Sequence, residues 1–312
     1  MASRTSHMHT VPRGYLAGFA DRSAPRDKPH VWRFERRLDE PKLISVRNVS
    51  VRRDIYALWT AAGVPDISIE TELLSKTVDD GFPELIALLE SGQEPSYWGW
   101  RRLSRFIAFQ LVRTPRSFQM HRDACARAGL KVGRNDPQLG MVYMAPIIEN
   151  WICQLKWFIL WNRTDFAFLT SDNPVTTWAD RGSAFETGVG FVDPALRVLF
   201  PLSPKICVAT VQTRASWEAI TGESPEREGS FTEKFELSIQ SAALTVDGVI
   251  RHNQVTTSNA EKYAYATRNE DRLQLFMRDW FTERPAPVRR DDHQPIGSPL
   301  GVGRRQRTHD DP

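Results

Sequence analysis

Apolar residues recur near the helical period through the middle of the chain, which predicts a run of helices there. The pattern over Ile69 to Leu89 is interrupted by Pro83, so it predicts two helices and not one. The segment Tyr97 to Arg113 has the clearest amphipathic pattern, with Leu103, Phe106, Ile107 and Leu111 on one stripe and Arg101, Arg102 and Arg105 opposite. The most apolar segment, Met141 to Asn162, predicts one long buried helix.

The two ends of the chain show shorter apolar runs that are typical of strands. Val31 to Glu35 and Leu43 to Arg47 predict a hairpin, and Leu196 to Phe200 and Ile206 to Thr210 predict two strands later in the chain. Three C-terminal helices are predicted over Phe231 to Ala243, Val255 to Thr267 and Arg268 to Glu283. Together these elements predict an α+β fold, in which a helical middle packs on a mixed sheet built from N-terminal and C-terminal strands.

The segment Asp165 to Trp178, DFAFLTSDNPVTTW, links the longest apolar segment to a compact set of polar side chains. Alternating large residues predict a buried strand up to Thr170, and the sequence Asp-Asn-Pro predicts a turn directly after it. Binding and catalytic sites are often formed by polar groups that directly follow a rigid strand. The alternative is an Asx-turn in which Asp172 bonds only to nearby backbone amides.

Composition narrows the class of protein. A chain of 312 residues is long enough to form a hydrophobic core. Its formal charge of +3 is small, so the net charge does not indicate a nucleic-acid partner. Its three cysteines are widely spaced and form no C-x-x-C, so neither a disulfide framework nor a cysteine-rich zinc site is indicated. The start lacks an apolar leader, and the apolar segment over 143–161 contains Glu149 and Lys156, so we expect a cytoplasmic protein without a membrane partner.

The domain boundaries follow from the same patterns. Residues 1–8 are expected to be a flexible lead-in, and residues 9–283 a single α+β domain. Residues 284–312 are rich in Pro, Arg and Asp with little to bury, so they are predicted to be a disordered tail.

The common catalytic signatures are absent: the chain has no P-loop, no G-x-G-x-x-G, no H-E-x-x-H and no G-x-S-x-G. Five polar residues from separated segments remain as catalytic candidates: His9, Glu72, Arg113, Ser171 and Asp172. His9 or Asp172 is a candidate general base or metal ligand, Arg113 a candidate for steadying an anion, and Ser171 a candidate nucleophile. We expect His9, Arg113 and Asp172 to lie close together if they form one site.

The order and spacing of several short motifs resemble a bacterial family catalogued as domain of unknown function 4238. The resemblance spans about residues 9–268. Its motifs are His9-x-x-Pro12-x-x-Tyr15-Leu16-x-x-Phe19, Ser45 to Tyr56, Glu70 to Leu74, Phe106 to Gln110 with Arg113-Thr114-Pro115, Phe168 to Val175, Pro201 to Pro204 and Asn259 to Tyr265. The resemblance implies one intact domain and no particular activity. The sequence IETELL leaves open whether Glu70 or Glu72 matches the acidic position of the family.

Two functions from different classes fit these observations. The first is a hydrolase acting on a phosphoester or nucleotide-like substrate, in which the five candidates converge. The second is a non-catalytic binding or regulatory module linked to defence or mobile elements, in which His9, Arg113 and Asp172 are buried polar groups that stabilise the fold. The expected partner is a small molecule or an anion, nucleic acid ranks last, and the identity of any cofactor or metal stays open.

Overall fold

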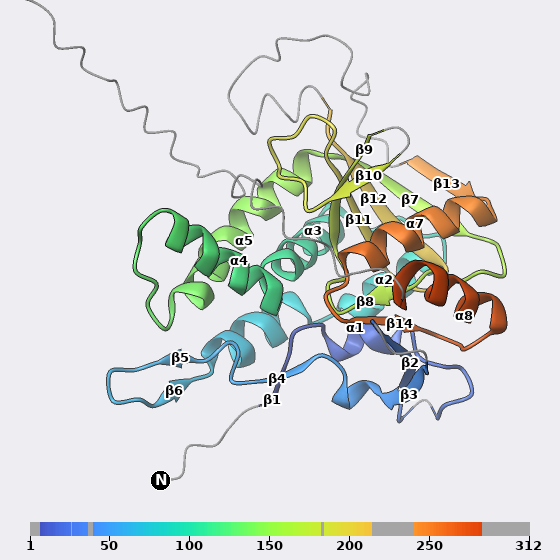
Figure 1. The fold of residues 1–312 in the computed structure, drawn as a ribbon. Helices are drawn as coiled ribbons and strands as arrows, with labels where there is room; N and C mark the ends of the chain where they lie inside the picture. The colour runs from blue at the N-terminus through green and yellow to red at the C-terminus, as the bar shows by residue number, and fades with distance from the viewer. Residues whose placement is uncertain (1–6, 26, 37–39, 182–183, 214–239, 283–312) are drawn as a thin grey trace, which may run out of the picture.

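The computed structural model describes residues 7–25, 27–36, 40–181, 184–213 and 240–282 (Figure 1). The predicted disordered tail lies outside these residues, as does most of the predicted lead-in. The helices are α1 (Arg13–Ala17), η1 (Val46–Asn48), η2 (Ile69–Val78), α2 (Phe82–Glu90), α3 (Tyr97–Val112), α4 (Pro115–Arg127), α5 (Asp136–Gln154), α7 (Val246–Asn259), α8 (Asp271–Met277) and η3 (Arg278–Thr282). None of these helices has the length and apolar character needed to cross a membrane.

The strands form two larger sheets and two short ribbons. A six-stranded sheet has the order β10 (Phe185–Thr187), β9 (Thr176–Asp180), β11 (Arg197–Pro201), β12 (Ile206–Val211), β7 (Lys156–Asn162), β13 (Gln240–Leu244), in which only the β13–β7 pair is parallel. A four-stranded sheet has the order β3 (Lys42–Ser45), β2 (His30–Glu35), β14 (Tyr263–Ala266), β8 (Thr170–Ser171). The ribbons pair β1 (His7–His9) with β4 (Val51–Arg53), and β5 (Leu58–Trp59) with β6 (Pro65–Asp66).

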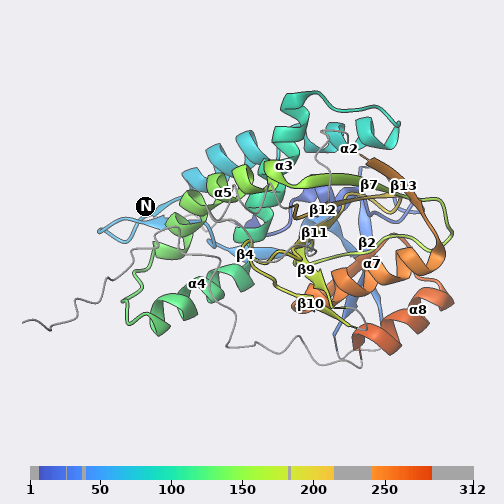
Figure 2. The same cartoon turned by 90° about the horizontal axis from the view of Figure 1, so that it is seen from above.

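The six-stranded sheet lies between two groups of helices. Helices α3 and α5 lie on one side of it, and α7 with α8 lies on the other, as the view from above shows (Figure 2). The faces of the sheet differ accordingly: Val198, Phe200 and Val208 belong to the core cluster shared with α3 and α5, whereas Leu199 and Cys207 belong to the cluster under α7. Two-sided burial explains why these strands are almost continuously apolar.

The predicted α+β class is confirmed, and the four-stranded sheet joins N-terminal strands β2 and β3 to C-terminal strand β14. The hairpin over residues 31–47 is confirmed as β2 and β3, and the break at Pro83 separates η2 from α2. Local signals set several helix starts: the side chains of Ser96, Thr114 and Thr245 accept hydrogen bonds from the amides of Gly99, Ser117 and Gly248.

Three predicted helices end too late. The helix predicted over 141–162 ends at Gln154, and its last seven residues form strand β7, because Trp157, Phe158, Ile159 and Leu160 suit a buried strand as well as a helix. The helix predicted over 255–267 is observed as α7 over Val246–Asn259, so it begins and ends earlier than predicted, and the chain continues into β14. The helix predicted over 231–243 is also wrong at its end, since residues 240–244 form β13, and its remainder lies outside the described residues.

The strand predicted up to Thr170 is buried but largely irregular. Only Thr170 and Ser171 pair with β14. The backbone before them is satisfied by a side chain instead, because Asn253 of α7 donates to the carbonyl of Ala167 and accepts from the amide of Leu169, each at 2.9 Å. The amide of Phe168 also donates to the carbonyl of Pro204 at 3.1 Å, so bonds from two separate segments replace those of a neighbouring strand, and no local pattern of apolar residues could reveal them.

Tyr15 of α1 connects the N-terminal segment to both larger sheets. Its hydroxyl donates to the carbonyl of Pro201 at 2.7 Å and accepts from the hydroxyl of Thr170 at 2.6 Å. The ring is fully buried and stacks on Phe200 with centroids 5.1 Å apart. The position of α1, and of the chain just before it, therefore depends on this one side chain.

Replacing Tyr15→Phe should lower the free energy of unfolding by about 1–3 kcal/mol, because the carbonyl of Pro201 and the hydroxyl of Thr170 lose a buried partner. Urea denaturation followed by fluorescence measures this loss. The exposed Tyr97→Phe is the matched control and should change the unfolding free energy by less than about 0.5 kcal/mol. Equal effects of the two variants would contradict the role assigned to the Tyr15 hydroxyl.

Candidate functional site

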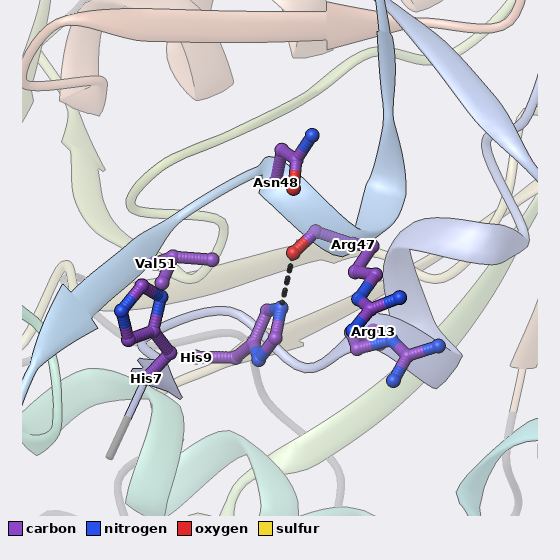
Figure 3. Close-up of a pocket in the computed structure, with 6 residues that line it drawn as sticks. All are labelled: His7, His9, Arg13, Arg47, Asn48 and Val51. Atoms are coloured by element: carbon purple, nitrogen blue, oxygen red, sulfur yellow. Dashed lines mark hydrogen bonds between the residues drawn. The ribbon is translucent and has the colours of Figure 1, made fainter. Parts of the chain in front are cut away.

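A pocket of about 550 Å³ opens on the face of the ribbon that β1 and β4 form (Figure 3). Its lining comes from four elements: His7 and His9 from β1, Arg13 from α1, Arg47 and Asn48 from η1, and Val51 from β4. We refer to it as the cationic pocket, because its lining holds two arginines and two histidines and includes no acidic residue. The pairing of β1 with β4 places His9 opposite Val51, 42 residues later in the chain, and the bond of His9 to the carbonyl of Arg47 places it beside η1.

The orientation of His9 is set by one hydrogen bond. Its Nε2 lies 3.2 Å from the carbonyl oxygen of Arg47, and a carbonyl can only accept, so Nε2 carries the proton. The neutral ring therefore has its lone pair on Nδ1. Burial lowers the pKa of His9, and the nearby charges of Arg13, Arg113 and His7 lower it further, against the carbonyl of Arg47, which raises it. The imidazole is thus neutral at pH 7 and able to accept a proton.

In the close-up view the side chains of Arg13 and Arg47 lie on one side of the His9 ring and His7 lies on the other (Figure 3), and all four residues line the same pocket. Both arginines are exposed, and within the described part of the chain neither forms an ion pair. Two like charges side by side repel each other unless an anion lies between them. Planar guanidinium groups suit phosphate and carboxylate oxygens in particular.

Arg113 is buried behind this pocket and tied to its neighbours. Its Nη1 donates to Oδ1 of Asp79 at 2.9 Å, and its Nε donates to Oε1 of Gln110, also at 2.9 Å. Gln110 in turn donates to the backbone carbonyl of Thr10 at 3.0 Å, next to His9 in the chain. Arg113 therefore acts on the pocket through its charge and by fixing the strand that carries His9, and it does not line the pocket.

The two glutamates at the start of η2 have different surroundings. Helix η2 is a π-helix, closed by a bond from the amide of Asp79 to the carbonyl of Leu74 at 2.8 Å. Glu72 is exposed and pairs with Lys76 at 2.8 Å across one turn. Glu70 is half-buried near Arg113 and Asp79, and burial raises its pKa to about 7 while the charge of Arg113 opposes the rise.

Ser171 and Asp172 lie at the junction between β8, β14 and the end of α7. Both oxygens of Asp172 accept backbone amides, Oδ1 from Glu261 at 2.9 Å and Oδ2 from Lys262 and Tyr263 at 2.8 and 2.9 Å. Ser171 is fully buried, and its hydroxyl accepts the amide of Asn173. Burial raises the pKa of Asp172 to about 6, although the three amide donors favour its ionised form.

The same junction is closed by a reciprocal pair of asparagines. Asn259 donates to the carbonyls of Asn173 and Val175, and Asn173 donates back to the carbonyl of Asn259 at 3.3 Å. These bonds bring the turn after β8 and the C-terminus of α7 into one unit, 86 residues apart in the chain. The geometry around Asp172 is that of an Asx-type anchor for this junction.

Of the five sequence-derived candidates, His9 lines the cationic pocket and Arg113 lies within its electrostatic reach. Within the described residues, Asp172 bonds only to the backbone of residues 261–263, and neither it nor Ser171 or Glu72 lines the pocket. The catalytic assignment of these residues stays a prediction. Arg13, Arg47 and Asn48 carried no functional assignment from the sequence, since an isolated exposed arginine gives no signal until strand pairing places it beside another.

The described residues contain no cluster of three or more His, Cys, Asp and Glu side chains that could hold a metal ion. The fold and the pocket define an α+β protein with a cationic, histidine-containing pocket on a two-stranded ribbon. A family model described as protein of unknown function (DUF4238) matches residues 8–135 and 131–270, and the chain belongs to this family. No curated protein and no solved structure was found to match the chain.

Replacing Asp172→Asn should lower the free energy of unfolding by about 2–4 kcal/mol at pH 8, because an amide nitrogen then faces backbone N–H donors that now bond to a carboxylate. Denaturant unfolding measures the loss. Asp279→Asn is a matched control at an exposed surface pair with Arg278 and should cost less than about 1 kcal/mol. A variant at Asp172 with unchanged stability would contradict the anchoring role.

Glu70 should make the wild-type protein less stable as the pH rises from 4.5 to 7. Its folded pKa of about 7 lies above the ordinary 4.5, so the ionised form is the disfavoured one in the fold. The free energy of unfolding is measured for wild type and Glu70→Gln from pH 4.5 to 8. The difference between the variant and wild type should rise by about 1–2 kcal/mol over this range in favour of the variant, a figure that allows for partial exposure of the side chain.

The exposed Glu72→Gln supplies the control for Glu70, since it removes the same charge two residues along the same helix. Its pH profile should run parallel to that of wild type. Taking the difference between each variant and wild type also removes the contribution of Asp172, whose raised pKa has the same sign. Parallel profiles for both variants would contradict the rise in the pKa of Glu70 that its burial causes.

Proposed function

We propose that the protein is a hydrolase that acts on phosphoesters, and that the phosphoryl group binds in the cationic pocket. One observation carries this proposal: two exposed arginines with no ion-pair partner in the described chain lie beside a neutral histidine whose proton-accepting nitrogen is left open. Structural roles explain buried arginines such as Arg113, but they do not explain this pair. Exposed like charges contribute nothing to stability and suit an anionic ligand.

The chemistry assigned to each residue follows from its position. Arg13 and Arg47 bind the phosphoryl oxygens and offset charge that develops in the transition state. A water molecule attacks phosphorus while Nδ1 of His9 accepts its proton, and the bond between phosphorus and the ester oxygen breaks. The leaving oxygen takes a proton from solvent, to which the pocket is open, and His9 then returns its own proton to solvent. Asn48 supplies an uncharged donor at the edge of the pocket.

Arg113 supports this site as a positioning residue. Its charge helps to keep His9 neutral, and its bond to Gln110 fixes the backbone of Thr10 beside His9. This role differs from direct contact with an anion, for which the side chain is too deeply buried. Asp172 and Ser171 support the fold at the end of α7 in this proposal.

A non-catalytic binding or regulatory module is the second candidate function. It is favoured by the bonding of Asp172, Ser171 and Arg113, all of which are engaged with other protein groups. Such a module would use the same cationic pocket to hold an anion without breaking a bond. The two functions therefore share the binding step and differ in turnover.

The test of the first candidate compares binding with turnover in His9→Gln, which keeps a donor for the carbonyl of Arg47. Hydrolysis of bis-p-nitrophenyl phosphate should fall by about 100-fold or more, while the affinity for inorganic phosphate, measured by calorimetry, changes by less than about threefold. His30→Gln is the control, because that histidine bonds only to the nearby carbonyl of Lys28 and should leave both values unchanged.

The double variant Arg13→Gln with Arg47→Gln should lose phosphate affinity by about 10-fold or more. Wild-type protein that binds phosphate but hydrolyses no phosphoester would support the binding module. Wild-type protein that does not bind phosphate would contradict both functions at this pocket.

A further inference from the structure

The side-chain partners of the histidines set His7 apart from the others. Five histidines lie in the described part of the chain, and four of them are held by a hydrogen bond inside the protein: His9 to the carbonyl of Arg47, His30 to that of Lys28, His252 to that of Gly248 and His121 to the thiol of Cys125. The imidazole of His7 has no such partner among these residues, and it is exposed where it lines the cationic pocket. Its ring nitrogens are therefore available to a molecule in the pocket.

Strand β1 places His7 and His9 on the same face of the ribbon. Residues two apart along a strand project to the same side and are separated by roughly 7 Å. Met8 projects from the other face and is fully buried. In the close-up view His7 lies on one side of the His9 ring, and Arg13 and Arg47 lie on the other (Figure 3). The two imidazoles therefore line different parts of one pocket.

The proposed hydrolysis involves proton transfers on two sides of phosphorus. The attacking and leaving oxygens lie roughly in line through phosphorus, so the base that accepts the proton of the attacking water is remote from the leaving oxygen. A leaving group such as p-nitrophenolate is stable as an anion, and solvent protonates it after the bond breaks. An alkoxide is far more basic, so its departure is accelerated by an acid that donates a proton while the bond breaks. An acid placed apart from His9 would therefore extend the reaction to esters of alcohols.

We propose that His7 is this general acid, and that the substrates are phosphoesters whose leaving group is an alcohol. The inference rests on the proposed hydrolase. Arg13 and Arg47 hold oxygens that stay on phosphorus, and the leaving oxygen is directed to the part of the pocket that His7 lines. The protonated imidazole of His7 donates to that oxygen while its bond to phosphorus breaks, and the alcohol departs.

The protons balance over one turnover. The attacking water gives its oxygen to phosphorus and one proton to Nδ1 of His9, while His7 gives one proton to the departing alcohol. His9 then releases its proton to solvent and His7 takes one up, so water and the ester are the only reactants. The negative charge of the bound phosphoryl group attracts the protonated imidazole of His7 and opposes the repulsion from Arg13 and Arg47.

The experiment uses two esters that share a methyl phosphate group and differ in the leaving group, p-nitrophenyl methyl phosphate and benzyl methyl phosphate. Phosphorus NMR follows the methyl phosphate released, and kcat/KM is determined for wild type, His7→Gln and His9→Gln. We expect His7→Gln to lower kcat/KM for the benzyl ester by about 100-fold or more and for the nitrophenyl ester by less than about threefold, because only the alkoxide needs the acid. His9→Gln should lower both values by similar factors, since both reactions need an activated water.

Two controls accompany these measurements. The affinity of His7→Gln for inorganic phosphate, measured by calorimetry, should stay within about threefold of wild type, because the arginines that bind the anion are unchanged. His30→Gln should leave kcat/KM for both esters unchanged, since that histidine bonds to the nearby carbonyl of Lys28 and does not line the pocket.

The outcomes separate this inference from the hydrolase on which it rests. Equal losses of His7→Gln on the two esters, or no loss on the benzyl ester, would overturn the role of His7 and leave the hydrolase standing. Wild-type protein that hydrolyses only the nitrophenyl ester would overturn the substrate class. Hydrolysis of neither ester would overturn the proposed hydrolase and this inference with it.

Discussion

The buried guanidinium of Arg113 constrains the segments that carry the cationic pocket. A charge with 1% exposure is costly unless it is paired and hydrogen-bonded, so the groups around Arg113 have little freedom. Asp79 supplies the opposite charge from the end of η2, and Gln110 supplies a second acceptor from the same helix as Arg113. Because the amide of Gln110 then holds the carbonyl of Thr10, the need to satisfy one buried charge fixes the strand that presents His9.

This arrangement explains why the cationic pocket has a defined shape although its lining residues are mostly exposed. The ribbon of β1 and β4 has three paired residues on each strand and could not hold a geometry alone. The ribbon is fixed to the protein by the fully buried side chain of Met8 and by the hydrogen bond from Gln110 to the carbonyl of Thr10. Tyr15 holds the following helix against Pro201 and Thr170. Exposed side chains thus extend from a backbone that buried groups keep rigid, as a binding site requires.

The sequence predicted the fold wherever burial and secondary structure agree. Helix α3, with its single apolar stripe, and strands β11 and β12, with continuous apolar runs, were correctly placed. The prediction was wrong at residues 156–162, where the apolar run suits a helix and a strand equally. This segment is a strand because it pairs with β12. It was also wrong at residues 165–169, where the amide of Asn253 satisfies the backbone that a neighbouring strand was expected to pair with.

The candidate site was harder to predict from the sequence than the fold, because its residues come from segments that are distant in the chain. His9 could be singled out because it stands in a short motif. The position of Arg47 beside it follows only from the pairing of β1 with β4, which places His9 opposite Val51, 42 residues later in the chain. That Glu70 and not Glu72 lies near Arg113 follows from the winding of η2, a π-helix whose register no amphipathic pattern specifies. Interactions that join distant segments through single side chains leave no periodic trace, and the site is built from such interactions.

Arg113 and Arg47 differ in burial and in their partners within the protein. Arg113 has its principal partners inside the protein, so its charge is already offset and its removal would disturb the fold first. Arg47 orients His9 through its backbone carbonyl, and its exposed side chain lines the same pocket as that of Arg13. A protein gains no stability from two adjacent exposed cations, which repel each other weakly in water. The proposal of an anionic ligand rests on this juxtaposition of two exposed cations and a histidine of fixed tautomer, which the internal contacts of the fold do not explain.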